Sequence, residues 1–307
     1  MSAAASDIVI LTGGTGGAKL ARGLAEVAGP ERLAAIVNTG DDVEIYGAHV
    51  SPDPDLVSFW LADLIDERGW GLRGDSFAVM DALRELGVDV WFNLGDRDLA
   101  WCLERARMLA EGHTPTAALA RLNAAIGLRA RVLPVSDDPV RTWVRTGQAG
   151  WCAFQEYMIR ERAEGIVEGL EYRGAEQARP SEHALAAIAG AGTIVIGPSN
   201  PLASIAPILA VPGIREALLD APAPIVAVSP IVGGEILKGP TAAFMAFGAL
   251  DCNADGIVDF YGELLDGIVA DEDVGRLTTL RTETRMPDAA ARARLAEQTL
   301  TFAAALA

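Results

Sequence analysis

The chain has 307 residues, of which half are hydrophobic, and it carries a formal net charge of −17 at pH 7. A chain of this length and composition buries a sizeable core, whereas so much negative charge argues against binding to nucleic acid or to an anionic membrane surface. No basic segment precedes the first apolar run, and no uncharged apolar stretch reaches about 18 residues. We therefore expect no leader segment, no membrane contact and a cytoplasmic location.

The three cysteines, Cys102, Cys152 and Cys252, lie far apart, and the chain has only three histidines. This spacing disfavours a zinc site or a disulfide framework and favours a reducing compartment. We expect each cysteine to be a small buried hydrophobic residue, and any metal to be held by oxygen ligands.

Short apolar runs typical of buried strands alternate along the chain with stretches of helical periodicity. The runs span residues 8–11, 33–37, 88–94, 130–133, 193–196 and 225–228. This alternation predicts an α/β fold with a mostly parallel sheet that carries helices on both faces. We interpret residues 1–307 as a single α/β domain, with an inserted helical and hairpin region at roughly 60–179.

Within that inserted region, two short runs in residues 142–156 flank the turn sequence GQAG, which predicts a β-hairpin. The sequence GLEYRG, residues 169–174, is interpreted as an isolated strand. Beyond the region, Pro180, Ser181 and Glu182 predict the start of a helix, and residues 287–307 have the spacing of an amphipathic helix.

The first apolar run leads directly into the glycine-rich sequence TGGTGGAK, which is followed by helical periodicity. Backbone N–H groups at such a strand-to-helix turn can bind an anion, with the positive end of the helix dipole behind them. The spacing matches neither the dinucleotide fingerprint G-x-G-x-x-G nor the Walker sequence, and a tight turn alone would also use glycine. We favour a phosphate site formed by Gly13, Gly14, Thr15, Gly16, Gly17 and Lys19.

Acidic residues follow the second run. Because ligands gather outside the carboxyl ends of parallel strands, Asn38 to Asp42 should face the same crevice as the glycine loop. Asp41, Asp42, Asp53 and Asp55 place four carboxylates within fifteen residues. Such hard oxygen ligands near a phosphate suit Mg²⁺, although aspartates also commonly cap turns and helix starts. The residues alone do not separate a metal ligand from a general base.

Three later loops add polar candidates at the ends of predicted strands. After the third run, Asp96 and Arg97 begin a helix, where Arg97 could clamp phosphate or the pair could simply be exposed. After the fifth and sixth runs come small and polar residues that can hydrogen-bond a base, a ribose or a phosphate. These are Gly197, Ser199, Asn200 and Ser229, followed by Lys238. With no Ser-His-Asp or Cys-His arrangement suggested, the loops together favour transfer of a phosphoryl or phosphate-linked group.

The ordered motifs resemble the 2-phospho-L-lactate transferase family of coenzyme F-420 biosynthesis, from about residue 8 to about residue 272. The motifs are GGTGGAKL, NTGDD, SPDPD, LGDRD, LPVSDDPV, GPSNPLASIAPIL and VSPIVGGEILKGP. The resemblance implies a Rossmann-like, Mg²⁺-dependent enzyme that is usually a homodimer. Such an enzyme transfers a 2-phospholactyl, phosphoenolpyruvyl or phosphoglyceryl group from a guanosine-diphosphate-activated donor to the ribityl hydroxyl of the deazaflavin Fo, and releases GMP. Which of the three acids is carried stays open.

The resemblance also implies roles for particular residues. It places the catalytic, metal-binding carboxylates at Asp42 and Asp55, with Asp55 near the Fo hydroxyl, and the glycine and GPSN loops on the nucleotide side. We assign Asp96 and Arg97 to the Fo side as well. Apolar walls for the deazaflavin ring are expected from the aromatic residues between SPDPD and LGDRD, although most of these are individually more typical of a core. They are Phe59, Trp60, Trp70, Phe77, Trp91 and Phe92.

Two departures from the family pattern and two rival functions qualify this prediction. Tyr46 and Leu56 stand where the family often has, respectively, a histidine or other polar residue and a threonine. One rival is a nucleotide-sugar-binding regulatory protein of the gluconeogenesis-factor type, which shares the GGTG opening but lacks the SPDPD and LGDRD elements. The other is a dinucleotide-dependent oxidoreductase, which the glycine spacing and the missing ribose-binding acid disfavour.

Overall fold

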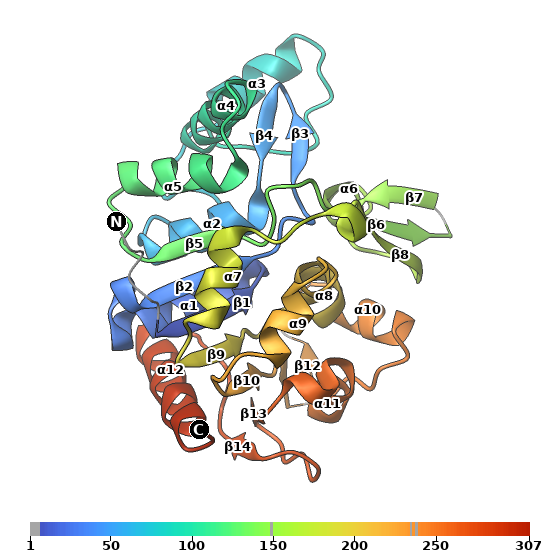
Figure 1. Cartoon of the computed structure of the whole chain (residues 1–307). Coiled ribbons are helices and arrows are strands. Elements are labelled where there is room, and N and C mark those ends of the chain that lie inside the picture. The colour runs from blue at the N-terminus through green and yellow to red at the C-terminus, as the bar shows by residue number, and fades with distance from the viewer. Residues whose placement is uncertain (1–6, 148–149, 234, 237–238) are drawn as a thin grey trace.

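The computed structural model describes residues 7–147, 150–233, 235–236 and 239–307. At its centre lies a seven-stranded sheet in the order β14-β13-β10-β9-β1-β2-β5, in which every neighbouring pair is parallel (Figure 1). Its strands are β1 (Ile8–Thr12), β2 (Leu33–Val37), β5 (Arg131–Pro134), β9 (Thr193–Ile196), β10 (Ile225–Val228), β13 (Gly267–Ala270) and β14 (Thr279–Arg281). The predicted Rossmann-like α/β fold is therefore confirmed.

Helices cover both faces of this sheet. Ile8 and Ile10 of β1 pack with the helices of one face, whereas Val9 and Leu11 pack with those of the other, as expected when successive side chains alternate. One face carries α1 (Gly14–Ala28), α2 (Pro52–Leu61) and α12 (Ala289–Ala304). The opposite face carries α7 (Glu182–Ala189), α8 (Ala206–Leu209), α9 (Ile214–Leu219) and α11 (Ala254–Tyr261). Burial on both sides explains why the central strands are continuous apolar runs.

The order of strands reverses at β1. From β1 the chain builds outward through β2 and β5 on one side, and through β9, β10, β13 and β14 on the other. In an open parallel sheet, such a switch point leaves a crevice outside the carboxyl ends of the two central strands. The loops after β1 and β9 lie at this crevice.

Two smaller groups of elements lie outside the sheet (Figure 1). At the top of the figure, the antiparallel hairpin of β3 (Val43–Ile45) and β4 (Ala48–Val50) packs against α4 (Asp96–Ala110), with α3 (Ala78–Glu85) beside α4. The other group is the three-stranded sheet β7-β6-β8. Its strands are β6 (Arg141–Thr146), β7 (Gly150–Ala153) and β8 (Val167–Arg173). Other elements outside the central sheet are α5 (Pro115–Ala125), α6 (Phe154–Ile159), η3 (Pro201–Ile205), β11 (Ile231–Val232), β12 (Glu235–Ile236) and α10 (Thr241–Phe247).

Several predicted elements are confirmed. Strands form at or within one residue of the runs 8–11, 33–37, 130–133, 193–196 and 225–228, whereas β13 and β14 were not predicted. The predicted hairpin is β6 and β7, and the two predicted helix starts correspond to α7 and α12. The GLEYRG strand is not isolated, because β8 pairs antiparallel with β6. Among the described helices, none is long and apolar enough to cross a membrane.

Two expectations were wrong. Residues 88–94 form no strand, because Val90, Phe92 and Leu94 pack against β4 and α4 outside the sheet. Cys102 and Cys152 are buried as expected, but Cys252 is exposed. An apolar run thus predicts that its residues are buried, whereas the element that covers them depends on the tertiary structure.

Candidate active site

A cavity of about 940 Å³ lies at the carboxyl ends of β1 and β9, which is the crevice expected from the strand order. The glycine loop and the loop after β9 form one wall, and aromatic residues form another. Among the residues predicted for nucleotide and phosphate, those lining the cavity are Gly13, Gly14, Thr15, Gly16, Lys19, Ser199, Asn200 and Ser229. Gly17, Asn38 and Gly197 do not line it. Lys238 lies outside the described residues.

Hydrogen bonds already occupy part of the glycine loop. The Gly14 N–H, at the start of α1, donates to Asp53 Oδ1 at 2.6 Å. The Gly13 N–H donates to Ser199 Oγ at 3.3 Å, and the Ser199 hydroxyl donates to the Gly13 carbonyl at 2.7 Å. The N–H groups of Thr15 and Gly16 precede the first i→i−4 bond of the helix. These two amides are therefore the groups best placed to bind an anion at this end of the cavity.

The later glycines of the loop allow close packing. A Cβ at Gly16 would lie 2.2 Å from the Pro198 carbonyl oxygen, and a Cβ at Gly17 would lie 1.7 Å from Thr12 Oγ1. Neither position has room for a side chain. The two glycines hold α1 against the loop after β9, so the tight-turn explanation and the phosphate explanation both apply to the same sequence.

A pair of carboxylates faces the cavity beside the glycine loop. Asn38 Nδ2 donates both to Asp41 Oδ1 at 2.9 Å and to Asp53 Oδ2 at 2.8 Å, and Gln155 Nε2 donates to Asp41 Oδ2 at 3.3 Å. Both aspartates are buried and line the cavity. Burial raises the pKa of Asp53 to about 6, against the opposing effect of the hydrogen bonds from Asn38 and Gly14. Burial and the nearby Asp53 carboxylate raise the pKa of Asp41 well above its usual range. Neither forms an ion pair with a cation of the described residues.

Asp42 faces away from this cavity, although Asp41 beside it does not. Asp42 lines a separate cavity of about 250 Å³. Its carboxylate accepts from Ser51 Oγ at 2.6 Å and lies 3.2 Å from His49 Nε2, while Arg141 approaches to 4.0 Å. The expectation that all of residues 38–42 face one crevice is therefore wrong, because consecutive loop residues point in different directions. The metal-binding role of Asp42 stays a prediction.

Asp55 lines the large cavity and is held by a buried ion pair. Arg105 Nη1 donates to Asp55 Oδ2 at 3.0 Å, Nη2 donates to Oδ1, and Trp101 Nε1 also donates to Oδ1 at 2.8 Å. Arg105 itself lines the smaller cavity. Asp55 thus lines the same cavity as the glycine loop, and both of its carboxylate oxygens already have partners. Its roles toward metal and Fo stay predictions.

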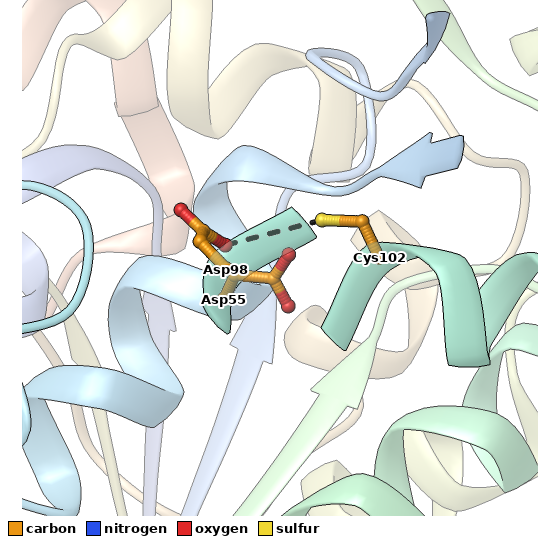
Figure 2. A group of neighbouring side chains, drawn as sticks. All are labelled: Asp55, Asp98 and Cys102. Carbon is orange, nitrogen blue, oxygen red and sulfur yellow. Dashed lines mark hydrogen bonds between the residues drawn. The ribbon is translucent and has the colours of Figure 1, made fainter. Parts of the chain in front are cut away.

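Asp98 stands beside Asp55 in the same wall (Figure 2). Burial, with the Asp55 and Asp75 carboxylates nearby, raises the pKa of Asp98 to about 7. Cys102 Sγ lies 3.9 Å from Asp98 Oδ1, and ligand atoms of these two residues and Asp55 lie within 4.8 Å of one another. In the described part of the chain, no other three acidic, cysteine or histidine side chains cluster this closely. A sulfur and an arginine-bound carboxylate do not suit Mg²⁺, so this cluster is a poor magnesium site.

Asp96 and Arg97 do not line the cavity. They begin α4 rather than follow a strand, since no strand forms at 88–94. The Asp96 carboxylate accepts from the backbone N–H groups of Ala78 and Val79, at 3.1 and 2.9 Å, at the start of α3. Arg97 is exposed. Their assignment to Fo stays a prediction, while Asp98 in the same LGDRD motif is the residue that reaches the cavity wall.

The expected aromatic wall is present in part. Four of the residues named from the sequence line the cavity, namely Phe59, Trp70, Trp91 and Phe92, whereas Trp60 and Phe77 do not. Trp60 instead lies beneath Lys19, whose ammonium is 5.7 Å from the ring centroid. The misassigned run 88–94 is therefore apolar partly because it supplies Trp91 and Phe92 to a cavity.

Other lining residues were not predicted. From α6 come Phe154, Gln155, Met158 and Ile159, and from the segment after β14 come Thr284, Arg285, Met286 and Pro287. Arg105, which lies in α4 after the LGDRD motif, was also not predicted as a site residue. No local pattern marks these residues, because they reach the site through contacts distant in sequence.

Comparisons with known proteins agree with this geometry. Residues 8–301 match the family model described as 2-phospho-L-lactate transferase CofD. The 2-phospho-L-lactate transferase of Methanosarcina mazei is 38% identical over 266 residues, which cover 86% of this chain and 87% of that protein. The phosphoenolpyruvate transferase of Kitasatospora aureofaciens is 42% identical over 275 residues, covering 86% and 84%.

Among solved structures, a UPF0052 family protein from Bacillus halodurans has a similar fold, with a TM-score of 0.63 and 17% identity over 96% of this chain and 98% of that one. At this identity the likeness concerns the fold alone. The family match, in contrast, extends over nearly the whole chain and includes the loops that line the cavity. The chain therefore belongs to the 2-phospho-L-lactate transferase CofD family and is an enzyme of that type.

Proposed function

We propose that the protein transfers a phospho-three-carbon-acid group from a guanosine-diphosphate-activated donor to the ribityl hydroxyl of Fo, releasing GMP, in coenzyme F-420 biosynthesis. One observation carries this proposal: a single cavity joins the glycine loop, a set of buried carboxylates and an aromatic wall. The glycine loop suits a nucleoside diphosphate, the carboxylates suit a hydroxyl that is to be activated, and the aromatic wall suits a flat ring. Membership of a transferase family favours this function over a nucleotide-sugar-binding regulator.

The donor is assigned to the end formed by the glycine loop and the loop after β9. The Thr15 and Gly16 amides, which precede the first i→i−4 bond of α1, and the positive end of the α1 dipole favour a phosphate there. Ser199, Asn200 and Ser229 line the same end. Asn200 accepts from the Leu202 and Ala203 amides, both at 3.0 Å, which leaves its side-chain N–H₂ as a donor.

Mg²⁺ fits the carboxylates at this end. A phosphate bound beside Asp41 and Asp53 would meet two acidic groups that have no cationic partner in the described part of the chain. A divalent cation between them removes this repulsion, and hard carboxylate oxygens are the ligands that Mg²⁺ prefers. We assign Asp53 and Asp41 as the residues that would hold it, with the family-implied ligands Asp42 and Asp55 to be compared in the same assay. When bound, the metal would neutralise charge on the transferred phosphate.

The acceptor is assigned to the aromatic end. Phe59, Trp70, Trp91 and Phe92 provide an apolar surface for the deazaflavin ring, and Asp55 and Asp98 lie in the wall between that surface and the glycine loop. A hydroxyl of the ribityl chain would therefore meet carboxylates. With a pKa of about 7, Asp98 can accept a proton near neutral pH, whereas Asp55, fixed by Arg105, is suited to orient the hydroxyl.

The transfer itself would be an in-line displacement. The ribityl hydroxyl oxygen attacks the phosphorus that carries the three-carbon acid, and its proton passes to Asp98. The bond from that phosphorus to the bridging oxygen breaks, and GMP leaves with this oxygen. The backbone amides and Lys19 at the glycine-loop end of the cavity counter the charge that develops on the phosphates.

The test uses the purified protein with Fo, Mg²⁺ and each of the three donors in separate reactions. We expect release of GMP and formation of a more acidic deazaflavin with at least one donor, and the donor that reacts fastest identifies the acid. A protein that binds GDP but neither binds nor modifies Fo with any donor would contradict the proposal and favour a nucleotide-binding regulator. Chromatography with light scattering would test the expected homodimer.

A further inference from the structure

The segment that joins β14 to α12 forms part of the cavity wall. Thr284, Arg285, Met286 and Pro287 all line the large cavity, although they follow the last recognised motif in the sequence. Lys19 Nζ donates to the Met286 carbonyl at 3.2 Å, which links the segment to α1. The chain therefore brings residues 284–287 to the glycine-loop end of the cavity, where the donor is assigned.

The Thr284 hydroxyl has no hydrogen-bond partner among the residues that the structure describes. Thr284 is only 4% exposed, and its Oγ1 has no hydrogen-bond partner in the described part of the chain. By contrast, the Thr282 hydroxyl two residues earlier donates to Gln298 Oε1 at 2.9 Å. A buried hydroxyl without a partner costs free energy, and such a group in a cavity wall is typical of a site that awaits a ligand.

Among the described residues, Arg285 has no ion-pair partner, although other arginines in this part of the fold do. Arg281 is 3.3 Å from Asp273, Arg294 is 3.6 Å from Glu283, and Arg292 is 2.8 Å from Glu26. Arg285 is exposed and forms no ion pair with a described carboxylate, yet it lines the cavity. An unpaired guanidinium at a cavity wall is suited to bind a phosphate through its forked donors.

The cationic side chains that line the cavity lie at different parts of it. Among the described residues, Lys19, Arg68 and Arg285 are those that line it. Arg68 pairs with Asp66 and lies 4.4 Å from the Trp70 ring centroid, at the aromatic end. Arg285 thus adds positive charge to a cavity whose wall also carries the carboxylates Asp41 and Asp53, which would oppose an anionic donor.

From these contacts we infer that Thr284 and Arg285 bind the phosphate groups of the donor, with the Thr284 hydroxyl and the Arg285 guanidinium as hydrogen-bond donors. The inference rests on the proposed function, because it takes the donor to be a nucleoside diphosphate derivative. It adds a second phosphate-binding element, from the C-terminal part of the chain, at the glycine-loop end of the cavity.

Titration calorimetry with GDP in the presence of Mg²⁺ tests the inference. We expect Arg285→Gln to weaken GDP binding by about tenfold, as loss of a charge-assisted hydrogen bond predicts, and to weaken guanosine binding much less. Arg121→Gln, on the exposed face of α5, is the matched control with the same loss of charge and should bind GDP like the wild type. Raising the salt concentration should reduce the difference between Arg285→Gln and wild type.

Thr284→Val gives a second readout that a structural role would not produce. Because the hydroxyl has no described partner, valine should leave the melting temperature of the ligand-free protein unchanged or higher, while GDP binding weakens by about threefold or more. Thr282→Val is its control: it breaks the bond to Gln298, so it should lower the melting temperature and leave GDP binding unchanged.

Three results would overturn the inference. The first is equal GDP affinity in Arg285→Gln and Arg121→Gln, and the second is an equal loss of guanosine and GDP binding in Arg285→Gln. The third is a lower melting temperature with unchanged GDP affinity in Thr284→Val. If the wild-type protein itself fails to bind GDP with Mg²⁺, the proposed function fails and the inference with it, so the two failures are distinguishable.

Discussion

Arg105 and Asp55 form a buried ion pair that separates two cavities. The Asp55 side lines the large cavity, and the Arg105 side lines the small one that contains Asp42 and His49. The carboxylate accepts from both terminal nitrogens of the guanidinium, and Arg105 Nη1 also donates to the His49 carbonyl at 3.1 Å. The pair links α2 to α4 across 50 residues of sequence. It fixes the position of the carboxylate that we assign to the acceptor hydroxyl.

Arg105→Met should destabilise the protein by about 3–5 kcal/mol, because it leaves the Asp55 carboxylate buried without its cation. Urea unfolding measures this change. Arg107→Met, on the same helix, is the control: Arg107 is exposed and pairs with Glu104 and Glu111, so its loss should change the free energy of unfolding far less than the loss of Arg105. Equal unfolding free energies for the two variants would contradict a buried, uncompensated charge.

Asp98→Asn should change the pH dependence of stability. The folded-state pKa of about 7 lies above the ordinary value of about 3.9, so the folded protein binds this proton more tightly than the unfolded chain does. That contribution is fully present below about pH 4 and is lost as the pH rises through about 7. Since asparagine does not titrate, the melting temperature of Asp98→Asn relative to wild type should rise by about 4 °C between pH 4 and pH 8.

The control for this measurement is Asp63→Asn, which removes an exposed carboxylate that lines neither cavity. Its melting temperature relative to wild type should stay constant over the same pH range. If the melting temperature of Asp98→Asn relative to wild type is also constant over this pH range, burial does not raise the pKa of Asp98.

Gly17→Ala should be far more destabilising than an ordinary glycine substitution, because its Cβ would lie 1.7 Å from Thr12 Oγ1 and 2.6 Å from Ser199 Oγ. We expect a loss of about 2 kcal/mol or more from overpacking. Gly275→Ala is the control, since its Cβ would meet no atom within 4 Å and its backbone is not left-handed. Thermal unfolding of the two variants compares them, and similar melting temperatures would show that α1 can move away from the loop after β9.

Asp53→Asn should impair Mg²⁺-dependent GDP binding more than Asp42→Asn does, because Asp53 lines the large cavity and Asp42 lines the small one. Loss of one anionic ligand is expected to raise the Mg²⁺ concentration needed for half-maximal binding by about tenfold. Titrating Mg²⁺ at constant GDP, with Asp63→Asn as a control, measures this. A larger effect of Asp42→Asn would instead support the ligand set implied by the family resemblance.

The sequence predicts the sheet well where strands are buried on both faces. β1, β2, β9 and β10 are continuous apolar runs bounded by turn residues, and each lies inside the sheet. β13 and β14 were not predicted: β14 has only three residues, none of them buried, whereas β13 has the length and burial of β10 and is a true omission. The run 88–94 shows the converse error, since residues that line a cavity have the same composition as residues in a strand.

The candidate site is predicted in outline by the order of loops after the strands. The direction of a side chain within a loop is not encoded in a local pattern, and so Asp41 and Asp42 could not be assigned to different cavities beforehand. Arg105 and Thr284 reach the site only because α4 and the segment after β14 pack there. Such contacts depend on tertiary structure rather than on spacing along the chain.

The hydrogen bond from the Gly14 amide to Asp53 has a consequence for the order in which reactants bind. An acidic side chain stands against the helix end that is to receive phosphate, so a free nucleotide would meet repulsion that a nucleotide already bound to its cation would not. On the proposed function, metal and donor would then behave kinetically as a single reactant. The initial rate is expected to follow the concentration of their complex, and excess free nucleotide, which lowers free Mg²⁺, should slow turnover rather than saturate it.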